Sequence, residues 1–93
     1  LRLAKSLTTT SVLDYIALDN NVEISKIKVS KKLAGQTVLS SNIRQKFNLN
    51  IIAIEHNGVT DIEIRPEYSF TPSDVIVVIG KSDNMRRFEK SIE

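Results

Sequence analysis

The fold of this chain is decided by its middle stretch, residues 42–66, which reads NIRQKFNLNIIAIEHNGVTDIEIRP. Asn57-Gly58 lies between two runs rich in β-forming residues, and both central positions of a tight type I′ turn need positive φ, which Asn and Gly adopt readily. The stretch therefore predicts a hairpin with a helix before it. In chain order we expect a short helix over 42–47, a corner containing Asn48 and Asn50, a hydrophobic strand over 51–54, and an alternating strand over 61–65 that ends at Pro66.

The flanking segments add two more strands. Residues 22–29 read as a strand whose apolar positions change parity near Ser25-Lys26, which predicts a β-bulge there. Gly35 supplies a turn after that strand. Residues 75–80 are almost wholly apolar and, like 51–54, are typical of a strand that is covered on both faces.

Capping signals place the helices. Ser11-Val12-Leu13-Asp14 matches a capping box and predicts a short helix that runs through about Ile16. Ser40 or Ser41 is expected to cap the helix over 42–47, and Ser82 or Asp83 the terminal helix. The predicted buried faces, read from helical spacing, consist of Ile43 with Phe47, and of Met85, Phe88 and Ile92.

Length and composition limit what this chain is. Ninety-three residues suffice for one domain with a modest core, and no apolar run is long enough to span a bilayer. The chain has no cysteine, which excludes disulfides and thiolate metal sites. The compartment that fits this composition most simply is the cytoplasm. A net charge of +2, with acids and bases interleaved, makes no basic stripe, so we expect no nucleic-acid polymer as a partner.

The start of the chain reads as part of a longer protein. It has no initiator Met, and Leu3, Ala4 and Leu7 fit one face of a helix already under way. We expect residues 1–10 to end a connecting helix from a preceding N-terminal domain, and residues 11–93 to form one domain.

The sequence lacks the constellations that carry out catalysis. It has one His, no nucleophile elbow, no Walker loop and no dinucleotide-binding glycine pattern. His56 next to Glu55 reads as a surface or strand-end histidine, and Asp61 with Glu63 as the solvated side of the hairpin. We therefore expect a protein that is not an enzyme and holds no metal.

Arg44 and Asn50 are the residues with most binding potential. A guanidinium presents a planar fork that suits phosphate, and a nearby amide can read a base or ribose edge. The same two residues fit a second interpretation equally well, in which Arg44 lies on a helix surface, Asn50 lies in a turn, and neither binds a ligand. The patterns by themselves leave both interpretations open.

The ordered set of motifs resembles the C-terminal lobe of the regulator-of-potassium-conductance domain, the TrkA-C type. The similarity covers about residues 11–80. It is carried by 22–29, by LAGQTV at 33–38, by 42–54, and by SDVIVVIG at 73–80. The resemblance implies an α+β fold with a small mixed β-sheet and flanking helices, which forms a homodimer. The preceding residues 11–16 look like the linker of Ktr-type cytoplasmic gating subunits, in which a nucleotide-binding lobe comes first.

The resemblance also implies a ligand, the second messenger cyclic di-AMP. The family's phosphate-binding Arg falls on Arg44 and its Asn on Asn50. The resemblance also carries over an aliphatic wall, formed by Val38, Ile43, Ile51 and Pro66. We add Lys46 and Leu49, which lie on the same stretch, as candidate ligand-binding residues.

We therefore expect a cytoplasmic regulatory module that binds cyclic di-AMP at a homodimer interface and controls potassium uptake. Its full-length protein would contact a membrane potassium-translocating subunit. A two-fold symmetric ligand suits an isologous interface, because each contact is then made twice. The alternatives are a constitutive dimerisation lobe without a ligand, and a sensor lobe of another transporter or of a transcription factor.

Overall fold

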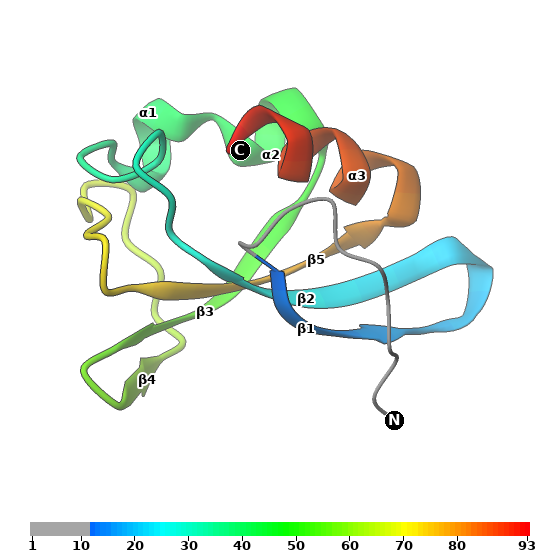
Figure 1. Cartoon of the computed structure of the whole chain (residues 1–93), viewed down its shortest axis with the longest axis horizontal. Helices are drawn as coiled ribbons and strands as arrows, with labels where there is room; N and C mark the ends of the chain where they lie inside the picture. The colour runs from blue at the N-terminus through cyan, green and yellow to red at the C-terminus, as the bar shows by residue number, and fades with distance from the viewer. Residues whose placement is uncertain (1–11) are drawn as a thin grey trace.

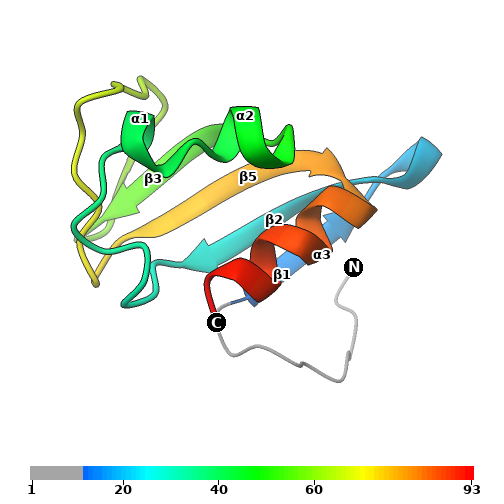
Figure 2. The same cartoon turned by 90° about the horizontal axis from the view of Figure 1, so that it is seen from above.

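The computed structural model describes residues 12–93. Three helices lie on one face of a five-stranded sheet with strand order β1-β2-β5-β3-β4 (Figures 1 and 2). The elements in chain order are β1 (Val12–Ala17), the 3-10 turn η1 (Asp19–Asn21), β2 (Val22–Lys28), α1 (Val38–Ser41), α2 (Ile43–Phe47), β3 (Asn50–His56), β4 (Val59–Asp61), β5 (Val75–Lys81) and α3 (Ser82–Ser91). All four strand pairs are antiparallel, so the α+β class is confirmed, whereas the expected mixed sheet is wrong.

The central hairpin is confirmed. Asn57 and Gly58 connect β3 to β4 with φ of 52° and 80°, as a type I′ turn requires. The second strand is shorter than predicted, because β4 ends at Asp61 and the strand over 61–65 does not form. The Asp61 carboxylate accepts the Glu63 N–H at 2.9 Å, a local turn that competes with the strand ladder.

The predicted short helix is wrong for residues 12–16, while its Ser11 cap and the connecting helix predicted over 1–10 lie outside the described residues. Residues 12–17 form β1, which pairs with β2 and buries Val12 opposite Ile27. The β-branched and aromatic residues of this segment, Val12, Tyr15 and Ile16, favour a strand, and the ladder with β2 outweighs a four-residue capping pattern.

The bulge predicted in β2 is also wrong. β2 pairs with β5 in unbroken register, and its buried side chains are Glu23, Ser25 and Ile27. Arg86 of α3 pairs with Glu23, and the Ser25 hydroxyl donates to Glu23 at 3.2 Å. Glu23 and Ser25 thus face the core, although they are polar. The apolar pattern predicted that Val22 and Ile24 face the core, which is wrong. The irregularities in register lie in β1 and β3 instead.

The helices do not begin at the predicted caps. Thr37 caps α1: its Oγ1 accepts the Ser40 N–H at 3.0 Å, and Ser40 Oγ accepts the Thr37 N–H at 2.9 Å. Asn42 precedes α2 and Lys81 precedes α3, neither with a capping side chain. The predictions of Ser40 or Ser41 before α2, and of Ser82 or Asp83 before α3, are therefore wrong.

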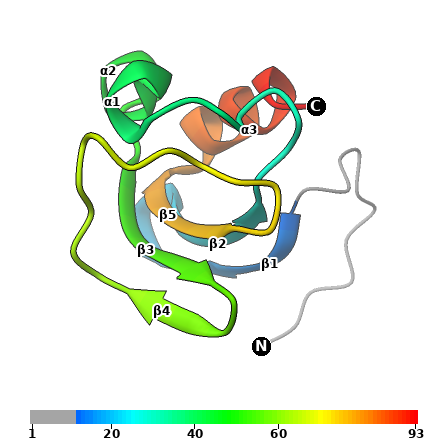
Figure 3. The same ribbon diagram turned by 90° about the vertical axis from the view of Figure 1, so that its left-hand side faces the viewer.

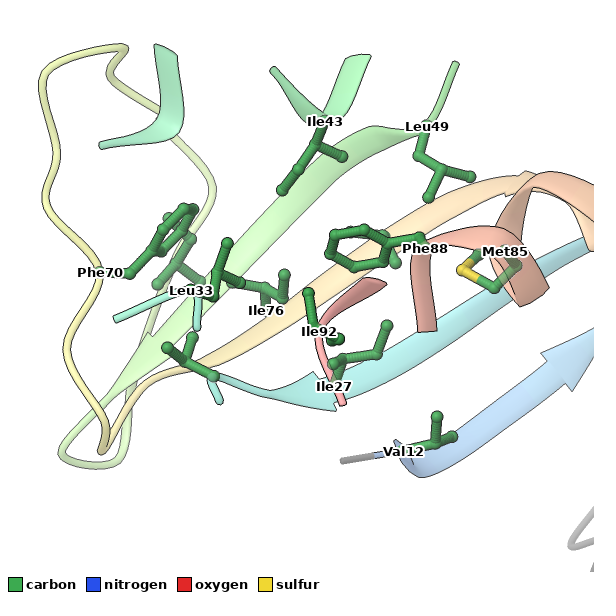
Figure 4. Close-up of a cluster of buried hydrophobic side chains, with 13 residues drawn as sticks. Val12, Ile27, Leu33, Ile43, Leu49, Phe70, Ile76, Met85, Phe88 and Ile92 are labelled. Atoms are coloured by element: carbon green, nitrogen blue, oxygen red, sulfur yellow. The ribbon is translucent and has the colours of Figure 1, made fainter. Parts of the chain in front are cut away.

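The core lies between the helices and the sheet. Met85, Phe88 and Ile92 point from α3 towards β2 and β5 (Figure 4), which confirms the predicted buried face of that helix. The Phe47 and Phe88 rings meet edge to face at 5.4 Å between centroids and so join α2 to α3. In the described part of the chain, no helix is long and apolar enough to cross a membrane.

Within residues 12–93, no helix lies on the opposite face of the sheet (Figure 3). Cross-strand partners share a face, so Ile24 with Ile79, and Lys26 with Val77, lie on this open side. They are half-buried, while Ile52 of β3 is 40% exposed. The expectation that 51–54 and 75–80 are covered on both faces therefore fails within one protomer.

Candidate ligand-binding site

A pocket of about 330 Å³ lies between α1, α2, the start of β3 and residues 64–66. It brings together all of the sequence-predicted site residues except Lys46. Its lining consists of Val38, Leu39, Asn42, Ile43, Arg44, Gln45, Leu49, Asn50, Ile51, Ile64 and Pro66.

Two left-handed asparagines shape this pocket. Asn42 (φ 52°) ends α1 and starts α2, and Asn48 (φ 55°) ends α2 with its N–H donating to the Arg44 carbonyl at 2.9 Å. Asn tolerates this conformation better than most residues. The chain therefore turns sharply on either side of α2 and places Arg44 and Asn50 on the lining of one pocket.

Arg44 and Asn50, two of the four polar residues that line the pocket, are available to a ligand. Arg44 and Asn50 are both exposed, and within residues 12–93 neither side chain has a hydrogen-bond or ion-pair partner. The remaining surface is mostly aliphatic, with Ile43 and Leu49 buried beneath it. An unpaired guanidinium beside an apolar wall can bind a phosphate while a flat ring packs on the wall.

Lys46 lies outside the pocket. It lines a separate cavity of about 140 Å³ together with Phe47 and Phe88. Residues two apart on a helix point about 200° apart, which separates Lys46 from Arg44. The structure therefore does not support grouping Lys46 with the other site residues.

Sequence reasoning missed four lining residues: Leu39, Asn42, Gln45 and Ile64. Leu39 is 67% exposed, and a leucine directly after Val38 could have been included as part of the same wall. Ile64 could not have been included, because the alternating pattern of 61–65 predicts a strand there, and that strand does not form.

A second group of polar residues meets at the other end of β3. Asp74 is fully buried, and its carboxylate pairs with the His56 ring through Nδ1. It also accepts the Tyr68 hydroxyl at 2.6 Å and the Thr71 N–H at 3.0 Å. We call Asp74 with these three partners the Asp74 clamp. His56 is the last residue of β3 and 44% of its side chain is exposed, so it is the strand-end histidine predicted, with a buried carboxylate as a partner that the sequence did not indicate.

The clamp shifts the acidity of its members. Burial by itself would raise the pKa of Asp74, but the hydrogen bonds from Tyr68, Thr71 and His56 together outweigh it and hold this pKa below its usual value. Burial, with the neighbouring Asp74 carboxylate, raises the pKa of Tyr68 to about 12. The described residues contain no group of His, Asp and Glu suited to a metal ion.

Gly80→Ala is expected to lower the free energy of unfolding by about 1–3 kcal/mol, because it overpacks the core. An added Cβ would lie 2.3 Å from Leu49 Cδ2 and 3.4 Å from the Asn48 carbonyl oxygen. Leu49 is almost fully buried, so its side chain would have to shift and repack to make room. Urea denaturation of Gly80→Ala, Leu49→Ala and the double variant measures the effect. The cost of Gly80→Ala should shrink in the Leu49→Ala background, and additive costs would contradict this account.

Comparison with known proteins gives consistent results. The chain is 31% identical over 88 residues to the Ktr system potassium uptake protein A of Bacillus subtilis (strain 168), covering 95% of this chain and 40% of the relative. The chain therefore spans about two fifths of the length of the curated relatives it matches.

Solved structures show the same fold. The C domain of the regulator of conductance of K⁺ in the potassium transport protein KtrA, in complex with cyclic di-AMP, is 33% identical over 74% of this chain and 81% of that one, with a TM-score of 0.72. The corresponding domain dimer of S. agalactiae BusR, also in complex with cyclic di-AMP, is 25% identical over 72% and 91% of the two chains, with a TM-score of 0.64. Residues 22–93 match the family model of the TrkA-C domain. With this match and the shared fold, the chain belongs to the TrkA-C domain family.

Proposed function

We propose that this domain is the ligand-sensing part of a potassium transporter's gating subunit and binds cyclic di-AMP at a homodimer interface to control potassium uptake. The observation that carries the proposal is that Arg44 and Asn50, whose side chains have no partner within residues 12–93, share one pocket with an aliphatic wall. The KtrA and BusR domains, whose structures contain cyclic di-AMP, have the same fold. The full-length subunit would work in the cytoplasm, attached to a membrane potassium-translocating subunit.

The pocket chemistry fits one half of a cyclic dinucleotide. Arg44 would neutralise a phosphate through charge-assisted hydrogen bonds. Val38, Ile51 and Pro66 line the same pocket and offer apolar surface to an adenine ring, whose edge the Asn50 amide would read. A volume of about 330 Å³ is at the lower end for a ligand site, which suits a ligand shared between two protomers.

The direct test is calorimetric titration of this domain with cyclic di-AMP, with cyclic di-GMP and ATP as controls. The proposal expects saturable heat and a raised melting temperature with cyclic di-AMP, and neither with ATP. No heat and no thermal shift with cyclic di-AMP would leave a ligand-free dimerisation lobe as the better description.

The domain is expected to be a dimer before any ligand is added. One protomer leaves Ile52 at 40% exposure, Leu39 at 67% and Ile62 at 77%, and a chain this short cannot cover them itself. Sedimentation velocity on the free domain measures the state. A monomer at micromolar concentration, with stability unchanged on dilution, would contradict the prediction.

Asn50→Ala is expected to weaken cyclic di-AMP binding by roughly fivefold, the value of one neutral hydrogen bond of about 1 kcal/mol. Asn48, not Asn50, is the left-handed residue of the corner, so the backbone should not change. The calorimetric titration is paired with a melting curve of the free domain. A loss of stability parallel to the loss of affinity would show that Asn50 supports the backbone instead.

A further inference from the structure

One wall of the pocket belongs to a segment with little regular structure. Residues 62–74 connect β4 to β5 and carry Ile64 and Pro66 to the pocket. Backbone hydrogen bonds join this segment to the start of α1: the Pro66 carbonyl accepts the Leu39 N–H at 3.0 Å, and the Tyr68 carbonyl accepts the Val38 N–H at 2.9 Å. Val38 and Leu39 themselves line the pocket.

Tyr68 connects this wall to the sheet. Its backbone carbonyl holds Val38, while its hydroxyl donates to Asp74 at 2.6 Å. Its ring packs edge to face on the buried Phe70, with centroids 6.1 Å apart. Tyr68 therefore contacts both the start of α1 and Asp74.

Asp74 is itself fixed in place. It directly precedes the central strand β5, and its backbone carbonyl accepts the Val29 N–H at 3.0 Å. Its N–H donates to the Thr71 carbonyl at 3.0 Å, which closes the turn before β5. The second carboxylate oxygen of Asp74, Oδ1, pairs with His56, which is the last residue of β3. The first residue of that strand is Asn50, which lines the pocket. The clamp thus ties the wall to the end of β3 and to the start of β5.

We propose that the Asp74 clamp is a positioning device for the ligand pocket: through Tyr68 it holds the wall that carries Ile64 and Pro66 against the start of α1. Its effect on a ligand rests on the function proposed above. Its effect on the wall does not, so the two are tested separately.

The ligand-free test is amide hydrogen exchange of Val38 and Leu39, measured by NMR on the whole domain. Tyr68→Phe keeps the ring and removes the bond to Asp74, so these two amides should exchange about fivefold faster, as expected for the loss of about one hydrogen bond. The β5 amides should not change. Exchange of Val38 and Leu39 at the parent rate in Tyr68→Phe would overturn the proposal.

His56 provides the second variant and a rescue. His56→Ala should speed exchange of the same two amides, whereas His56→Asn should restore the parent rate, since its side-chain N–H replaces the donor at ring Nδ1. Ser73→Ala is the matched control, because Ser73 lies in the same turn and, among the described residues, its hydroxyl is hydrogen-bonded only to Thr71 Oγ1, at 3.2 Å. Equal rates for His56→Asn and His56→Ala would show that the hydrogen bond is not what holds the wall.

Titration with cyclic di-AMP then links the wall to the site. Tyr68→Phe and His56→Ala should bind roughly fivefold to tenfold more weakly than the parent, as expected when a pre-organised wall becomes mobile, while Ser73→Ala and His56→Asn should match it. Parent-like affinity in both clamp variants would overturn the positioning role. If the parent domain itself does not bind, the proposed function fails, and the exchange rates alone decide whether the clamp holds the wall.

Discussion

Arg44→Ala is expected to weaken cyclic di-AMP binding by about tenfold to a hundredfold without changing the fold. Each charge-assisted hydrogen bond to phosphate is worth roughly 1.5–3 kcal/mol, each tenfold step in affinity is about 1.4 kcal/mol, and a dimer makes the contact twice. Because the Arg44 side chain has no partner in the described part of the free protomer, the melting temperature should not fall. Calorimetric titration with a melting curve measures both quantities.

Two matched variants sharpen this result. Arg44→Lys should recover only part of the affinity, because an ammonium keeps the charge but not the planar fork. Lys46→Ala removes a positive charge from the same helix outside the pocket and should leave affinity within about twofold, since an exposed, screened charge contributes little. Parent-like binding by a folded Arg44→Ala dimer would refute the assignment of the phosphate-binding residue.

Asp74→Ala is expected to lower the free energy of unfolding by roughly 2–4 kcal/mol, a large share of the 5–15 kcal/mol typical of a domain. The substitution leaves the Tyr68 hydroxyl and the Thr71 N–H without the acceptor that they have in the native fold. It also opens a space at a fully buried position. Urea denaturation near neutral pH measures the loss. A change below about 0.5 kcal/mol, typical of a surface substitution, would contradict the account.

The same carboxyl makes stability depend on pH in acid. Its folded pKa lies below the unfolded value of 3.8, so its contribution is fully present above that value and is lost as the pH falls through the folded pKa. Asp74→Asn keeps the shape but removes the titrating group. The parent should therefore lose more stability than Asp74→Asn below pH 4, as measured by urea unfolding at a series of pH values. Equal losses in the two proteins would contradict the assigned direction of the shift.

Local patterns predicted the parts of the fold whose chemistry is local. Asn57-Gly58 forms the expected turn because few residues other than Gly and Asn readily adopt positive φ. Met85, Phe88 and Ile92 are buried as their spacing predicted, since α3 is long enough to present one continuous apolar stripe. Residues 12–17 form a strand because they pair with β2, so the local capping pattern predicted a helix there incorrectly.

The candidate site divides in the same way. The sequence by itself determined the hairpin, the helical faces and, through resemblance, the residues proposed to bind a ligand. Only the tertiary structure decided that Arg44 and Asn50 share a pocket while Lys46 does not, and that His56 and Tyr68 meet on Asp74. The physical reason is that these groupings depend on how α2 packs and where residues 62–74 cross the start of α1. Both result from burying apolar side chains that are far apart in the sequence against one another. A short window of sequence does not contain both partners of such a contact.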